Sequence, residues 1–150
     1  MQTLDDQKQS VRKDASRLAD FIMFTQRSFL LNLSKELNRG NVSFPQFFLL
    51  GYLANEEFLT MTDISKKMGH STAAATGLVD RLEKLGYVQR LHAQEDRRKV
   101  MVQITRKGID LVDRIREEIV GSLVDLMEDL DKEEQEALLK TYGKISARTA

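Results

Sequence analysis

The stretch from Ser71 to Ile104 constrains the fold most, because a helical pattern ends at a glycine and two strand patterns follow it at once. The helix is predicted over 71–85, and Gly86 is typical of a helix-ending residue in the left-handed region. Strands are predicted over 87–92 and 99–104, joined by a basic tip at residues 95–99. A helix followed by such a wing suits a DNA groove and its flanking phosphates, since grooves admit helices and phosphates attract arginine and lysine.

A helix-turn-helix pattern leads into this unit. Residues 62–68 predict one or two helical turns closed by Gly69, after which Ser71 or Thr72 caps the next helix. The inward stripe of that helix is Ala75, Leu78, Val79, Leu82 and Leu85. Upstream, Ser43 and Gln46 form a capping box for a helix that runs to about Asn55, and residues 58–61 add a short strand.

Amphipathic helices are predicted on both sides of this core. Apolar residues at helical spacing from Val11 to Leu37 indicate one long first helix, and Asp131 with Glu134 starts a last one. Thr105 caps a fifth helix whose inward candidates are Ile109, Val112, Ile115, Ile119, Leu123, Leu126 and Leu130. The first helix is longer than a compact domain needs, so we expect an intertwined homodimer; an ordinary core helix is the alternative.

The predicted architecture is therefore one domain over residues 1–150, mainly α-helical with a small β-hairpin wing. Its winged helix-turn-helix DNA-binding region spans 44–105, and segments 11–39 and 109–147 supply the dimerisation helices.

The formal net charge is zero, but its distribution is uneven. Residues 61–107 carry 10 basic and 5 acidic side chains, whereas residues 108–150 carry 6 and 11. This split is expected if only the middle of the chain meets phosphate, although chance clustering is the alternative. The absence of cysteine excludes thiol chemistry and disulfides, and the polar N-terminus predicts neither a signal peptide nor a membrane anchor, so we expect a cytoplasmic protein.

Five segments resemble one known family. They are Pro45-Gln46-Phe47, Asp63-Ile64-Ser65, Asp80 to Val88, Asp96-Arg97-Arg98 and Ile104 to Gly108. Their order and separation resemble the MarR family of bacterial winged-helix regulators over residues 44–108. The resemblance implies a homodimer that binds near-palindromic operators on double-stranded DNA, usually as a repressor released by a small ligand. Gln94 departs from the proline that many members carry there, which predicts a more mobile wing tip.

The predicted DNA-binding residues divide between the helix and the wing. Ser71, Thr72 and Thr76 can bond base edges, while Ala73 and Ala74 can contact thymine methyls or let the backbone come close. Gly77 is unfavourable in a helix interior, so close approach to DNA or to another helix would explain it. The alternative is that these small residues merely fill the surface.

In the wing, Arg97, Arg98 and Lys99 are expected to meet phosphates, and by resemblance Arg98 enters the minor groove. Asp96 is expected to pair with one of these arginines and fix the tip. Arg81 can reach phosphate or form an ion pair with Asp80.

Other functions have less support. His70 and His92 are the only histidines, and their surroundings predict neither a metal site nor a cofactor. No nucleophile and base pattern indicates an enzyme. The aromatic group Phe21, Phe24, Phe47, Phe48 and Tyr52 predicts either a ligand pocket or core packing. Effectors of similar proteins are often small aromatic anions. The competing function is a winged-helix module that binds protein without sequence-specific DNA binding.

Overall fold

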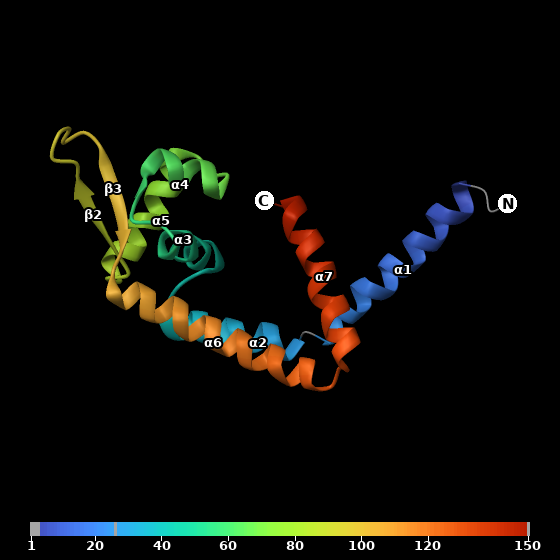
Figure 1. The fold of residues 1–150 in the computed structure, drawn as a ribbon. Helices are drawn as coiled ribbons and strands as arrows, with labels where there is room; N and C mark the ends of the chain where they lie inside the picture. The colour runs from blue at the N-terminus through green and yellow to red at the C-terminus, as the bar shows by residue number, and fades with distance from the viewer. Residues whose placement is uncertain (1–3, 26, 150) are drawn as a thin grey trace.

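The computed structural model describes residues 4–25 and 27–149 (Figure 1). Residues 4–25, 27–40 and 106–149 form a helical arm, which is joined to a winged helix-turn-helix. The helices among the described residues are α1 (Leu4–Thr25), α2 (Arg27–Gly40), α3 (Phe44–Ala54), α4 (Met61–Met68), α5 (Thr72–Lys84), α6 (Arg106–Glu128) and α7 (Lys132–Thr149). The strands are β1 (Leu59–Thr60), β2 (Val88–His92) and β3 (Val100–Ile104). None of these helices is long and apolar enough to cross a membrane.

Short-range signals begin and end the helices of the core. Ser43 and Gln46 form the predicted capping box of α3, with Pro45 in its first turn. Thr60 and Asp63 form a second capping box at α4, which ends at Gly69 in the left-handed region with φ of 62°. These caps therefore fix where α3 and α4 begin and where α4 ends.

The sheet is antiparallel, with β3 between β1 and β2. Leu59 on β1 and Arg90 on β2 both pair with Val102, which is fully buried, whereas Val100 and Ile104 are half-buried. Val102, at the centre of β3, is therefore the residue of this strand that reaches the core. Beyond β1 the sheet continues as a two-stranded ribbon, which forms the wing.

One apolar core joins α3, α4, α5 and the sheet. Its fully buried members include Leu49, Leu53, Ile64, Val79 and Leu82. The predicted inward stripe of α5 is confirmed, because Ala75, Val79 and Leu82 are buried. This packing fixes the face that α5 turns outward.

The helices α2 and α6 lie side by side and connect this core to the far end of the arm (Figure 1). Leu37, Leu111 and Ile115 are buried between them. Glu36 is only 5% exposed, and its carboxylate lies 2.8 Å from the Arg39 guanidinium and 3.3 Å from Nε of Arg114 on α6. Apolar contacts and a charged cluster therefore hold α2 against α6 within the arm.

The prediction of one first helix was wrong, because α1 ends at Thr25 and α2 begins at Arg27 with a different direction (Figure 1). The helix α2 packs along α6, whereas α1 leaves α2 at an angle (Figure 1). Leu123 and Leu126, predicted to face inward on α6, are 46% and 48% exposed. No element in the described part of the protomer covers them.

Candidate nucleic-acid interface

The recognition helix α5 presents a face of small and polar side chains. Its N-cap is Ser71, whose Oγ accepts a hydrogen bond from the Ala74 backbone N–H over 3.2 Å. Thr72, Ala73, Ala74 and Gly77 are exposed. A Cβ built on Gly77 would have no heavy atom of a neighbouring element within 4 Å, so packing within the protomer does not require glycine there.

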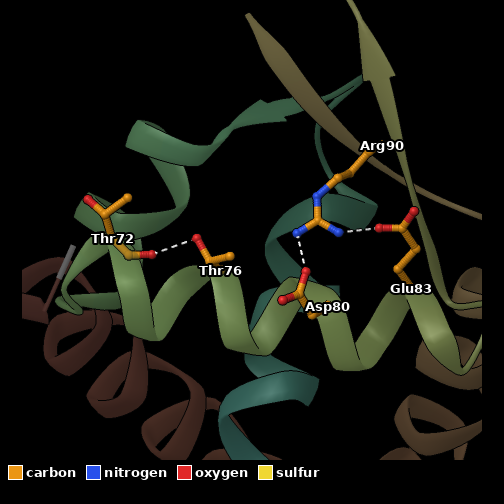
Figure 2. A network of polar contacts seen from close by, with 5 residues as sticks. All are labelled: Thr72, Thr76, Asp80, Glu83 and Arg90. Atoms are coloured by element: carbon orange, nitrogen blue, oxygen red, sulfur yellow. Dashed lines mark hydrogen bonds and ion pairs between the residues drawn. The ribbon is translucent and has the colours of Figure 1, made fainter. Parts of the chain in front are cut away.

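A hydrogen bond from Thr76 to the backbone of Thr72 limits how the Thr76 side chain can bond a base. The Thr76 hydroxyl donates to the Thr72 backbone carbonyl over 2.8 Å (Figure 2). Thr76 is left with acceptor lone pairs, whereas the Ser71 oxygen already accepts and keeps its own O–H to donate. These two residues therefore offer different hydrogen-bonding groups to a groove.

The wing tip is ordered by backbone hydrogen bonds around Asp96. Its carboxylate accepts from the Arg98 backbone N–H over 3.0 Å, and its carbonyl accepts from the Lys99 N–H over 3.0 Å. Asp96 thus fixes the tip as expected, but it does so through the Arg98 amide and not through a guanidinium, because an aspartate reaches the amide two residues on in an Asx-turn. The side chains of Arg97, Arg98 and Lys99 are exposed.

Arg90 on β2 joins the wing to the recognition helix, a role that the sequence analysis missed. Its guanidinium donates to Asp80 over 2.5 Å and to Glu83, both on α5 (Figure 2). Partial burial acts to lower the pKa of Arg90, but the hydrogen bonds and charges of Asp80 and Glu83 outweigh burial and raise that pKa. The signal in the sequence was a pair of acids one helical turn apart followed by an arginine on the next strand.

Arg81 has a different partner from the one expected. Its guanidinium donates to Oδ1 of Asn41 over 3.2 Å, because Asp80 already pairs with Arg90. Of the two roles left open for Arg81, the structure does not show the ion pair with Asp80, and contact with phosphate stays a prediction. Arg81 remains exposed on the outward side of α5.

The aromatic group is only partly brought together. The Phe47 and Phe48 rings on α3 have centroids 6.1 Å apart, and Lys67 lies 5.5 Å above the Tyr52 ring. Phe48 is 57% exposed, so this cluster is open to solvent. Phe21 belongs to α1, which extends away from α3 (Figure 1), and the Phe24 side chain lies outside the described residues.

An exposed small-residue helix, an exposed basic wing tip and an ionic bridge between them define a winged helix-turn-helix DNA-binding protein. A family model described as the MarR family matches residues 41–99. The HTH-type transcriptional regulator YfiV of Bacillus subtilis is 41% identical over 106 residues, which are 71% of this chain and 66% of YfiV. FarR of Neisseria gonorrhoeae is 33% identical over 104 residues, covering 69% of this chain and 70% of FarR. The chain belongs to the MarR family of transcriptional regulators.

Solved structures agree with this fold. The Staphylococcus aureus MepR complex with DNA has a TM-score of 0.73 at 21% identity and covers 88% of this chain and 99% of MepR. NadR in complex with 4-hydroxyphenylacetate has a TM-score of 0.59 at 25% identity and covers 83% of this chain and 88% of NadR.

Proposed function

We propose that this chain is a repressor that binds a near-palindromic operator as a homodimer, with α5 in the major groove and the wing on the flanking backbone. The observation that carries the proposal is the position of the exposed Arg97, Arg98 and Lys99 side chains at the tip of a hairpin whose strand β2 Arg90 ties to α5. This link lets one rigid unit present base-reading groups and phosphate-binding groups together. The MepR structure with DNA supports the same use of the fold.

The homodimer is supported by apolar side chains that the protomer leaves uncovered on its arm. They include Leu18 on α1, Leu30 and Leu31 on α2, Leu123 and Val124 on α6, and Leu139 and Tyr142 on α7. A second copy that buried these side chains would remove apolar surface from water. A two-fold dimer would also carry two recognition helices, which fit half-sites about one DNA turn, roughly 34–36 Å, apart.

The effector we propose is a small aromatic anion. The open cluster of Phe47, Phe48 and Tyr52 offers aromatic surface, and Lys67 lies above Tyr52. The Lys67 ammonium is 3.9 Å from the Glu56 carboxylate, so an anionic ligand would compete with Glu56 for it. NadR binds 4-hydroxyphenylacetate, which has this chemistry. A ligand held at this cluster would release the operator.

The test is selection of duplexes from a genomic fragment library, followed by affinity measurement over a range of salt concentrations. Tight binding to one duplex with a steep salt dependence is expected, together with a dimer in sedimentation. Absent or salt-insensitive binding would contradict the regulator and favour the protein-binding module. Addition of 4-hydroxyphenylacetate as a probe is expected to lower operator affinity, with 4-methylphenol as the uncharged control.

A further inference from the structure

The end of α2 meets the turn that follows the recognition helix and the first turns of α6 at one buried point. The carbonyl of Gly40, the last residue of α2, accepts a hydrogen bond from the Tyr87 hydroxyl over 2.7 Å. A Cβ on Gly40 would lie 2.9 Å from a methyl carbon of Leu111 on α6 and 3.5 Å from the Tyr87 hydroxyl oxygen. Glycine therefore allows α2 to end close to both elements.

The next residue adds a second link, this time to α5 itself. Asn41 has a positive φ of 56°, a conformation that asparagine tolerates better than most residues. Its Oδ1 accepts a hydrogen bond from the Arg81 guanidinium over 3.2 Å. The end of α2 thus holds both the outward side of α5 and the turn that follows it.

The first turn of α6 holds the same end of the recognition helix. Lys107 Nζ donates to the Leu85 carbonyl over 2.6 Å and lies 4.8 Å above the Tyr87 ring. The Thr105 hydroxyl donates to the Gly86 carbonyl over 2.6 Å. Hydrogen bonds from the ends of both α2 and α6 consequently hold the C-terminal end of α5 and the turn after it.

We propose that Tyr87 and Asn41 are positioning residues that set the orientation of α5 relative to the arm, and hence the half-site spacing that the dimer accepts. This inference rests on the proposed function. A small rotation of each α5 about its fastened end would change the separation of the two recognition helices, and an operator favours only the matching separation. These contacts involve no base, so they act on spacing and not on base identity.

The experiment uses the operator selected by the wild-type protein and two further duplexes, in which the spacer between the half-sites is one base pair shorter or longer. Tyr87→Phe removes the hydroxyl with little change of volume, and Asn41→Gly removes the acceptor while keeping a residue that allows positive φ. The quantity compared is the ratio of the affinity for the original duplex to the affinity for a duplex with altered spacing. Both variants are expected to lower this ratio by about fivefold, the effect of one lost hydrogen bond. Discrimination against a single-base change within a half-site is expected to stay at the wild-type level.

Asn41→Asp keeps an acceptor for Arg81 and is expected to restore the spacing preference. Asn38→Ala is the control, because it removes an exposed amide at the same helix end, and it should keep the wild-type spacing preference. Wild-type spacing preference in both Tyr87→Phe and Asn41→Gly, even with lower overall affinity, would overturn the inference and leave these contacts a structural role only. If one variant fails to fold by circular dichroism, the other decides. A wild-type protein that binds no duplex would overturn the proposed function as well.

Discussion

Arg90 on β2 donates to the carboxylate of Asp80 on α5 over 2.5 Å, which makes the strand leading to the wing and the recognition helix one unit (Figure 2). Glu83, one turn further along α5, accepts from the other terminal nitrogen of the same guanidinium. The arginine also neutralises two acids that would otherwise oppose an approaching phosphate. The network therefore acts on both the shape and the charge of the DNA-binding surface.

Arg90→Lys is expected to weaken operator binding about fivefold, because an ammonium keeps the charge but cannot hold two carboxylates with a planar fork. The free energy of unfolding should fall by about 1 kcal/mol, since the site is partly exposed and screened by solvent. Fluorescence anisotropy and urea denaturation measure these two quantities. Arg116→Lys, on an exposed pair with Glu117 of α6, is the matched control. Operator affinity of Arg90→Lys equal to that of the wild type would show that the bridge does not position the wing.

Much of the fold could be predicted because its signals are local. The N-caps at Ser43, Ser71 and Thr105 and the left-handed Gly86 each act within a few residues, and all four lie where the sequence predicts. The charge pattern likewise indicated the basic wing tip. Capping bonds and left-handed glycines depend on residues close together in the chain, so the sequence alone reveals them.

The partners of long polar side chains could not be predicted in this way. Arg90 reaches back ten residues to Asp80, and Arg81 reaches forty residues to Asn41, so both pairs depend on how the elements pack. The sequence also contains no sign of the break between α1 and α2, because apolar residues continue at helical spacing on both sides of it. Whether Ser71, Thr76 and the wing arginines contact DNA stays a prediction.

Arg98→Ala is expected to weaken operator binding and to reduce the slope of log affinity against log salt by about 1, the effect of one lost phosphate contact. The melting temperature should not change, because the side chain is exposed at the wing tip. Affinity measured at several salt concentrations gives the slope. Arg12→Ala, an exposed arginine on α1, should leave both the affinity and the slope unchanged.

Asp96→Ala is expected to lower operator affinity by loosening the wing tip, although Asp96 itself repels phosphate. The carboxylate holds the Arg98 amide, and its loss frees the backbone that carries Arg97 and Arg98. Asp96→Asn keeps an oxygen acceptor and is expected to bind more tightly than Asp96→Ala. Equal affinities for the two neutral variants, both above that of the wild type on the same duplex, would mean that Asp96 acts through its charge alone.

Glu36→Gln is expected to destabilise the arm in a pH-dependent way. The hydrogen bond from Arg39 lowers the pKa of Glu36 below its ordinary value of 4.5, against the effect of burial, and the charges of Arg39 and Arg114 add to this. A carboxyl with a lowered folded pKa stabilises the fold above its ordinary pKa, and this contribution is lost as pH falls through the folded pKa.

The difference between wild type and Glu36→Gln in free energy of unfolding should therefore be full at about pH 7 and shrink as the pH falls below about 4.5. Urea denaturation across this range measures it. Asp14→Asn alters an exposed carboxylate 4.0 Å from Arg17 on α1 and should show little difference at either pH. A constant difference for Glu36→Gln across the range would mean that its charge is not what stabilises the arm.

Gly77→Ala separates the stability of the recognition helix from its function. A Cβ at this position would meet no neighbouring element within 4 Å, and alanine favours a helix interior over glycine by about 1 kcal/mol, so the variant should unfold at higher urea concentration. If α5 approaches DNA as closely as its small exposed face allows, the added methyl should nevertheless weaken operator binding.

Gly121→Ala on α6 is the matched control, because its Cβ would also lie in open space, and it should gain similar stability without losing affinity. Greater stability of Gly77→Ala with unchanged affinity would show that the glycine is not needed for close approach to DNA.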